Sequence, residues 1–186
     1  MKSNGLEVYK NALSHKECQS LIYSFEHDDR KGPGVVGGPA VDTTFKASTD
    51  LSPWFQDPSY SQYNEIIQPV LDEYIDHFSE KYPILDDVSS WDLDDGYNIQ
   101  KYVDGEGYFK LHCEHARIYP LRLMAWMIYL NDAECGTEFP YLNTTLKAQE
   151  GTLAIWSAGW THAHKGVTPN KGEKYIATGW YSMLVY

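Results

Sequence analysis

The chain has 186 residues, of which 42% are hydrophobic and 15% aromatic, and it carries a formal charge of −11. This length fits one globular domain with a substantial core, and the hydrophobic content excludes a disordered chain. The acidic charge and the lack of any run of Lys or Arg disfavour nucleic acid as a partner. The start has no basic segment followed by an apolar stretch, and no window approaches a membrane span, so we expect neither a secretion signal nor a membrane partner.

The cysteine count favours a reducing compartment. Cys18, Cys113 and Cys135 are odd in number and have no Cys-x-x-Cys spacing. Free thiols of this kind are typical of the cytoplasm, where disulfides are rare. The same spacing disfavours a zinc knuckle or ribbon.

The first part of the chain has the pattern of two helical regions. Ser14 and Glu17 form a capping box before an apolar series at helical spacing, which predicts a helix from Ser14 to His27. A second helical pattern runs from Ser59 to Tyr82 and contains Pro69. That proline either kinks a single helix or lies in the first turn of a second one.

Between these helical regions lies the segment Lys31–Thr44, which contains the run GPGVVGGPAV. Its glycines and prolines predict an irregular loop and no regular element. The segment is either a plain connector or a mobile lid over an active site, since loops often carry such functions.

After Trp91 the pattern changes to short runs rich in β-branched and aromatic residues, separated by Gly, Asp and Asn. One run, LMAWMIYL, is apolar on both faces, which is typical of a central strand. Helices followed by a group of strands indicate a β-sandwich or barrel with helices outside. The four runs expected to be strands are Tyr97–Val103, Arg122–Asn131, Thr152–Ser157 and Lys174–Met183.

Two histidine-rich segments stand out within this β region. In the first, His112 and Glu114 are two positions apart, so on a strand both side chains face one point. A third ligand from a distant strand would complete the two-His-one-carboxylate triad of non-haem iron(II) oxygenases. In the second segment, His162 and His164 compete for that third position.

The order of motifs around these histidines closely resembles the prolyl 4-hydroxylase-like branch of the iron(II)/2-oxoglutarate dioxygenases. The resemblance covers about Tyr97 to Trp180, nearly half of the chain. Its parts in order are Tyr102, His112-Cys-Glu114, Arg122, Tyr129-Leu-Asn-Asp132, Gly136-Thr-Glu-Phe-Pro140, Gly151-Thr-Leu153, His164, Gly172-Glu-Lys-Tyr175 and Trp180.

The resemblance implies a mainly β fold with flanking α-helices, a double-stranded β-helix or jelly roll. It implies one catalytic domain over residues 1–186, with helical support at about 14–82 and the jelly-roll core at about 91–186. It further implies Fe(II), 2-oxoglutarate and O₂ as cofactor and cosubstrates, and allows ascorbate as an accessory reductant.

Carried over by position, His112, Glu114 and His164 are the expected metal ligands. The ten-residue offset from His164 to Lys174 favours His164 over His162. Lys174 is expected to bind the far carboxylate of 2-oxoglutarate by a charge-assisted bond, and the Tyr102 hydroxyl to touch the same group.

The sequence departs from the family pattern at the acid, which is Glu114 where the family usually has Asp. Its extra methylene moves the carboxylate outward by about one carbon–carbon bond. The negative charge is kept, which argues against a halogenase, because related halogenases lack the carboxylate so that chloride can bind.

The resemblance therefore predicts hydroxylation of a C–H bond in a peptidyl residue, with proline as the default, or in a free amino acid. The alternative is a non-catalytic cupin-like module that binds a metal or a sugar. The cupin spacing requires His-x-His followed closely by a Glu. After His162-Ala-His164 the next acid is Glu173, so the oxygenase is favoured.

Overall fold

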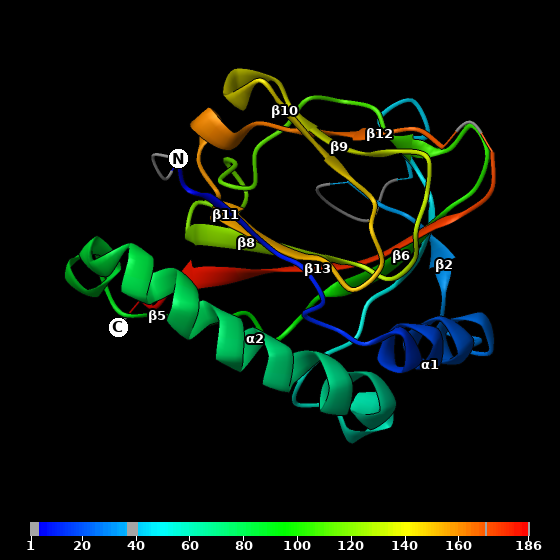
Figure 1. Ribbon diagram of the computed structural model, residues 1–186, viewed down its shortest axis with the longest axis horizontal. Helices are drawn as coiled ribbons and strands as arrows, with labels where there is room; N and C mark the ends of the chain where they lie inside the picture. Colours follow the sequence, from blue (N-terminus) through cyan, green and yellow to red (C-terminus); the bar gives the residue numbers. More distant parts are fainter. Residues whose placement is uncertain (1–3, 37–40, 170, 186) are drawn as a thin grey trace.

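The computed structural model describes residues 4–36, 41–169 and 171–185. Two helices lie beneath a large twisted sheet, and a smaller sheet lies above it, so the chain forms three layers (Figure 1). The helices of the described residues are α1 (His15–Glu26) and α2 (Ser61–Lys81). The strands are β1 (Leu6–Tyr9), β2 (Gly32–Pro33), β3 (Lys46–Ala47), β4 (Thr49–Leu51), β5 (Trp91–Leu93), β6 (Asn98–Tyr102), β7 (Gly107–Tyr108), β8 (Arg122–Tyr129), β9 (Gly136–Phe139), β10 (Thr144–Lys147), β11 (Leu153–Ser157), β12 (Lys165–Val167) and β13 (Lys174–Met183).

The large sheet runs in the order β1-β11-β8-β13-β6-β4-β2, with β5 paired to one end of β13. The smaller sheet has the order β10-β9-β12, and β3 pairs with β7. Neighbouring strands are antiparallel throughout the described residues, and strands distant in sequence lie side by side. Two antiparallel sheets that face each other over helices make the jelly roll that the sequence predicted.

Strand β8 lies at the centre of the large sheet, as its two apolar faces predicted. Its side chains alternate between the layers, because successive residues of a strand point to opposite faces. Met124, Trp126 and Ile128 pack toward the helices. Ala125, Met127 and Tyr129 pack in a second core between the two sheets. The functional cavity opens in that second layer.

The helices form where their sequence signals lie. Ser14 caps α1 through the predicted box with Glu17, and the Lys31 amine donates to three carbonyls at the C-terminal end of that helix, where a cation is stabilising. Pro69 lies inside a single helix, α2, and is exposed, so it does not start a second helix. No helix in the described part of the chain has the length and apolarity to cross a membrane.

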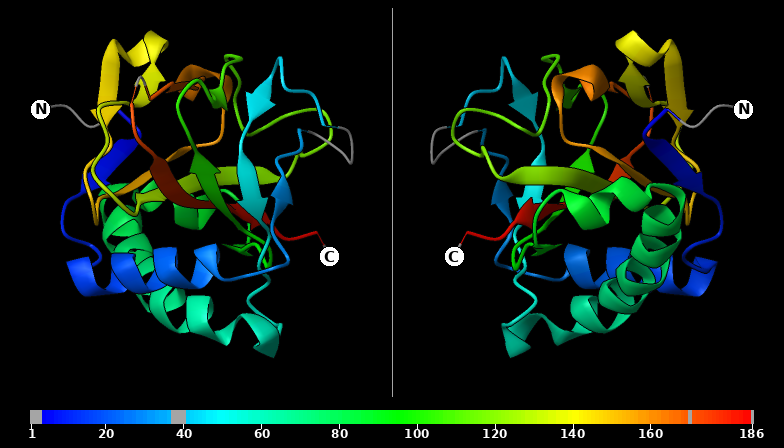
Figure 2. Two further views of the ribbon diagram at one scale, coloured as in Figure 1. Left: turned by 90° about the vertical axis from the view of Figure 1, so that its right-hand side faces the viewer. Right: turned by 90° about the vertical axis from the view of Figure 1, so that its left-hand side faces the viewer.

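The first part of the chain adds strands that the sequence did not reveal. The two views of Figure 2 show β4 and β2 extending the large sheet beyond β6, while β3 pairs with β7. The expectation that Lys31–Thr44 lacks any regular element is wrong at Gly32–Pro33, which form edge strand β2; proline is tolerated there because an edge strand need not donate its N–H. Residues 37–40 of that segment lie outside the described residues, so the lid stays a prediction.

Candidate metal and cosubstrate site

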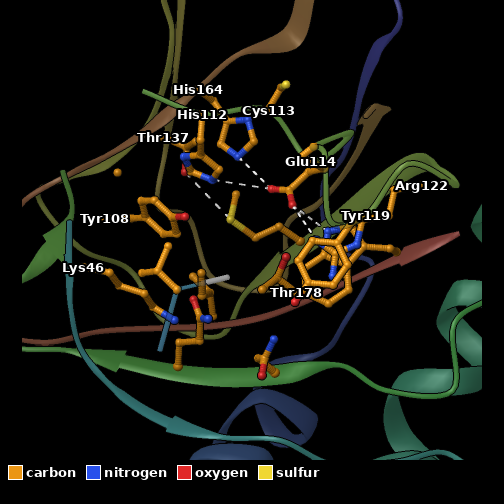
Figure 3. A pocket seen from close by; sticks show the side chains of 18 of the residues that line it. Lys46, Tyr108, His112, Cys113, Glu114, Tyr119, Arg122, Thr137, His164 and Thr178 are labelled. Atoms are coloured by element: carbon orange, nitrogen blue, oxygen red, sulfur yellow. Dashed lines mark hydrogen bonds and ion pairs between the residues drawn. The ribbon is translucent and has the colours of Figure 1, made fainter. Parts of the chain in front are cut away.

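A cavity of about 730 Å³ opens between the two sheets, within the usual size range of small-molecule sites. The large sheet lines it with Gln100 and Tyr102 from β6 and with Thr178 and Trp180 from β13. Within each strand the two residues are two positions apart, so their side chains point to the same face of the sheet. Thr137 of the smaller sheet lies across from them (Figure 3).

His112, Glu114 and His164 converge at one place in this cavity. The backbones of the two histidines pair reciprocally, with the His112 N–H 3.0 Å from the His164 oxygen and the return bond at 2.8 Å. Glu114 Oε1 lies 3.5 Å from His112 Nε2 and 3.3 Å from His164 Nε2. One potential ligand atom from each residue lies within 4.8 Å of the other two.

The local geometry of the first segment differs from the expectation. His112 forms an isolated bridge and Glu114 lies in a bend, so the two residues are not on a regular strand. They converge because the chain bends after the bridge to His164. The two-residue spacing therefore predicted the meeting of these side chains, but for the wrong backbone reason.

Each imidazole is held with the same ring nitrogen facing Glu114. Nδ1 of His112 lies 2.9 Å from the Lys110 carbonyl, and Nδ1 of His164 lies 3.0 Å from the His162 carbonyl. A carbonyl can only accept, so Nδ1 carries the proton and a neutral ring presents its Nε2 lone pair. Such backbone contacts orient histidine ligands in metal sites.

Neighbouring rings fix both imidazoles in place. Tyr108 stacks on His112 with ring centroids 3.8 Å apart and planes 16° apart. Trp156 meets His164 edge-on at 5.1 Å, and Phe139 lies 5.2 Å from the same ring. The rings therefore have little freedom to rotate away from Glu114.

Two donors hold the second carboxylate oxygen of Glu114. Trp180 Nε1 donates to Oε2 at 2.7 Å and Arg122 Nη1 at 3.4 Å, which leaves Oε1 turned toward the histidines. The Arg122 guanidinium lies 3.4 Å above the Trp180 ring and 3.8 Å from the Tyr119 ring. Burial raises the pKa of Glu114, but the contacts with His112 and His164 outweigh it and hold that pKa well below its usual range.

The other histidines lie outside the cluster. The ring of His162 is buried, with Nε2 2.9 Å from the Asn4 carbonyl, and burial lowers its pKa. His115 is exposed and its Nδ1 lies 3.2 Å from the Arg122 carbonyl. The three histidines of the helical part, His15, His27 and His77, are exposed.

Lys174 lies directly behind the cavity wall, and is 2% exposed. Its amine is 4.6 Å from the Tyr102 ring centroid and 3.5 Å from the Gly136 carbonyl. It has no carboxylate partner among the described residues, and burial lowers its pKa. The Tyr102 hydroxyl donates to Gln100 Oε1 at 2.7 Å, so its proton is already engaged within the chain.

The sequence alone predicted no role for several residues of the cavity. Arg122 and Trp180 were visible only as members of the motif series, and their contact with Glu114 comes from the fold. Lys46 and Asp50 of the N-terminal half also line the cavity. Nothing in their local sequence indicated this, since the segment before β4 looked like a connector.

The donor set at the converging histidines fits a divalent metal. Two imidazole Nε2 atoms and one carboxylate oxygen face one another, and a cation bound among them would contact all three. Two imidazoles with one carboxylate form the set that non-haem iron(II) oxygenases use, with positions left open for other ligands.

Comparison with known proteins identifies the class. Residues 97–182 match the model of the 2OG-Fe(II) oxygenase superfamily. A search of curated proteins found no match. The matched range includes both histidine segments, Lys174 and the strands from β6 to β12.

Solved structures of several prolyl hydroxylases share the fold. The viral collagen prolyl hydroxylase of Paramecium Bursaria Chlorella virus-1, in its 2OG complex, is 21% identical with a TM-score of 0.69, covering 98% of each chain. A Pseudomonas putida prolyl-4-hydroxylase is 15% identical with a TM-score of 0.74, covering 98% of this chain and 95% of the other. A Trichoplax adhaerens prolyl hydroxylase, in complex with a hypoxia inducible factor peptide fragment, is 15% identical with a TM-score of 0.77, covering 97% and 84%.

The family match, the jelly roll and the His-Glu-His cluster together define an iron(II)- and 2-oxoglutarate-dependent oxygenase. Residues 97–182 match the 2OG-Fe(II) oxygenase superfamily, for which Fe(II) is the cofactor and 2-oxoglutarate and O₂ are the cosubstrates, and the fold is similar to that of solved prolyl hydroxylases. The cupin-like alternative is accordingly disfavoured.

Proposed function

We propose that His112, Glu114 and His164 bind the iron of a hydroxylase that acts on a C–H bond of an amino-acid residue. The observation that carries this proposal is the convergence of two Nε2 atoms and Oε1 within 4.8 Å. When bound, iron supplies the oxygen chemistry, and the protein supplies ligands, orientation and a closed cavity.

Each surrounding residue has a distinct part in this proposal. The carbonyls behind His112 and His164 hold both rings in the tautomer that can bind a metal. Trp180 and Arg122 keep one Glu114 oxygen occupied, so the other faces the metal position. This support suits a glutamate, because its longer side chain has more freedom than the aspartate usual in the family.

Lys174 and Tyr102 are proposed to bind 2-oxoglutarate. A buried ammonium with no anionic partner among the described residues favours an anionic ligand, because an unpaired buried charge is costly. Gly166 and Tyr102 both line the cavity, and a Cβ at Gly166 would lie 3.7 Å from Lys174 Nζ. Two cavity-lining residues, Tyr102 and Gly166, therefore lie next to this amine.

The substrate is proposed to be an amino-acid residue, either within a peptide, with proline as the default, or as a free amino acid. Two of the structural neighbours are a collagen prolyl hydroxylase and a prolyl hydroxylase bound to a peptide fragment, which supports this class. The unpaired thiols of Cys18, Cys113 and Cys135 support a reducing location such as the cytoplasm. We further propose that residues 1–186 act as one catalytic domain.

The test measures succinate formed from 2-oxoglutarate by the Fe(II)-loaded protein across prolyl peptides and free amino acids. Product formation that depends on both Fe(II) and a substrate supports the proposal. Failure to bind Fe(II), measured anaerobically by calorimetry, would refute it regardless of the substrate chosen.

A further inference from the structure

A second charged cluster lines the same cavity apart from the metal ligands. The Lys46 ammonium pairs with Asp50, and their side chains are only 4% and 10% exposed. Figure 3 shows Lys46 and Tyr108 on one side of the cavity and Arg122 and Tyr119 on the other. A molecule bound between these sides would touch the charged pair at one end.

The chain orients this pair through four strands. Lys46 of β3 is opposite Tyr108 of β7, whose ring stacks on His112. Asp50 of β4 is opposite Gln100 of β6, and it accepts from Gln100 Nε2 at 3.4 Å and Ser48 Oγ at 2.7 Å. The pair is therefore one side-chain layer from the metal ligands and held by hydrogen bonds.

Both charged groups retain hydrogen-bonding capacity. An ammonium has three donors, and among the described residues the one recorded acceptor for Lys46 is Asp50. A carboxylate has about four lone-pair sites, and Asp50 uses three of them, for Lys46, Ser48 and Gln100. Asp50 can thus accept a hydrogen bond from one more cation, and Lys46 can donate to one more anion.

The backbone of Gly34 packs directly against the Lys46–Asp50 pair. Gly34 is buried and its N–H donates to the Ser48 carbonyl at 2.9 Å. A Cβ at Gly34 would overlap Ser48 Oγ and lie 3.1 Å from each Asp50 carboxylate oxygen, so glycine permits this close approach. Val35 and Val36 continue the cavity lining from there. Gly34, Val35 and Val36 therefore lie next to the charged end of the cavity.

We propose that Lys46 and Asp50 bind the carboxylate and the ammonium of a free α-amino acid, which makes this the substrate class of the enzyme. The inference rests on the proposed hydroxylase function and deepens it. A free α-amino acid carries both charges on one carbon, and so complements two opposite charges that are themselves in contact.

An internal peptide residue fits this charged pair less well. Its main chain has no charge at either end, so it would leave the buried pair without additional ionic partners. The same side chain should therefore be a substrate when free and lose this ability when its ends are capped.

The first experiment measures binding by calorimetry, anaerobically, to the protein loaded with Mn(II) and 2-oxoglutarate. The probes are the common L-amino acids, then the N-acetyl and the methyl-amide derivatives of each one that binds, together with prolyl peptides. We expect a free amino acid to bind, and each cap to weaken its affinity roughly 10- to 100-fold, because each removes a charge-assisted contact.

The second experiment uses Lys46→Met combined with Asp50→Leu, which removes both charges and leaves neither unpaired. We expect this variant to bind 2-oxoglutarate as the wild type does and to lose amino-acid affinity by at least roughly 100-fold. Lys101→Met is the matched control, because Lys101 also pairs with carboxylates but on the opposite face of β6.

The outcomes separate this inference from the proposed function. Turnover of prolyl peptides with no binding of any free amino acid would overturn the inference and leave the hydroxylase intact. Equal affinity for capped and free ligands, or a double variant that loses 2-oxoglutarate and not the amino acid, would overturn it as well. Absence of Fe(II) binding would instead overturn the proposed function.

Discussion

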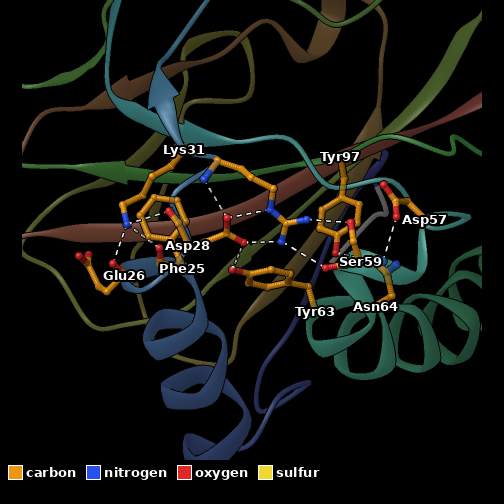
Figure 4. Close-up of polar contacts among 10 residues, drawn as sticks. Phe25, Glu26, Asp28, Lys31, Asp57, Ser59, Tyr63, Asn64 and Tyr97 are labelled. Carbon is orange, nitrogen blue, oxygen red and sulfur yellow. Dashed lines mark hydrogen bonds and ion pairs between the residues drawn. The ribbon is translucent and has the colours of Figure 1, made fainter.

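Two buried charge clusters of this protein differ in whether the chain satisfies them. In the first, at the end of α1, Asp28 accepts from Arg30 Nε at 2.8 Å, from Arg30 Nη2 at 2.6 Å and from the Tyr63 hydroxyl at 3.1 Å (Figure 4). Arg30 also donates to Ser59 at 2.8 Å. Each charge of this cluster has an opposite charge or a hydrogen-bond partner within the chain.

The second cluster, at His112, Glu114 and His164, consists of acceptors that face one another, and Lys174 behind it is a cation without a carboxylate among the described residues. The comparison teaches that burial alone does not indicate function. A cluster whose charges and donors are all paired within the chain stabilises the fold, whereas one that leaves a charge, donor or acceptor unused is arranged for ligands.

The largest effect is expected for His164→Ala. Metal affinity should fall roughly 1,000-fold or more, because few ligands share the binding energy of a protein metal site, roughly 10–16 kcal/mol for structural zinc. Anaerobic calorimetry with Fe(II) measures this. The matched control is His162→Ala, which removes a buried ring bonded to Asn4 and should lower stability while leaving metal affinity near that of the wild type. The reverse pattern would make His162 the ligand.

Lys174→Ala should raise the Kd for 2-oxoglutarate by more than roughly 100-fold, a loss of about 3–5 kcal/mol typical of broken buried pairs. Metal affinity should stay nearly intact. Without 2-oxoglutarate the variant should be at least as stable as the wild type, because it loses a buried cation that has no carboxylate partner among the described residues. Lys165→Ala, an exposed lysine paired with Glu138, is the control. Unchanged 2-oxoglutarate binding would remove Lys174 from the site.

Asp28 should make the fold sensitive to acid. The hydrogen bonds from Arg30 lower the pKa of Asp28 from 3.8 to about 2. Because the folded pKa is depressed, the stabilisation is full above the unfolded value, about pH 4, and is lost as pH falls toward 2. With allowance for the partly exposed Arg30, the charge of Asp28 contributes about 1–2 kcal/mol to the free energy of unfolding.

Asp28→Asn is the matching variant for that prediction. Urea unfolding should show the wild type more stable than the variant at neutral pH, with the difference shrinking between about pH 4 and pH 2. Iron affinity should be equal in both. A difference in unfolding free energy that is constant with pH would show that the charge of Asp28 does not stabilise the fold.

The smallest effect is expected for Trp180→Phe, which keeps the ring but removes the Nε1 donor to Glu114. Metal affinity should fall roughly 10-fold, the lower end for residues that orient a metal ligand. Trp91→Phe is the control, because its Nε1 donates to the Leu85 carbonyl far from the cavity. Equal losses in the two variants would assign the effect to packing.

The amino-acid sequence by itself determined the local elements and the residues that converge. The capping box at Ser14 set the start of α1, and the doubly apolar run of β8 set the central strand, because caps and periodicity act over a few neighbouring residues. The ordered motifs around His112 and His164 also predicted which side chains would meet.

Only the tertiary structure decided how those side chains are supported and what else lines the cavity. The bend at Glu114, its bonds to Trp180 and Arg122, and the Lys46–Asp50 pair all join segments far apart in the chain. No local pattern encodes such contacts, because they depend on which strands pair and in what register. The edge strand β2 was missed for the same reason, since a two-residue strand exists only through its pairing with β4.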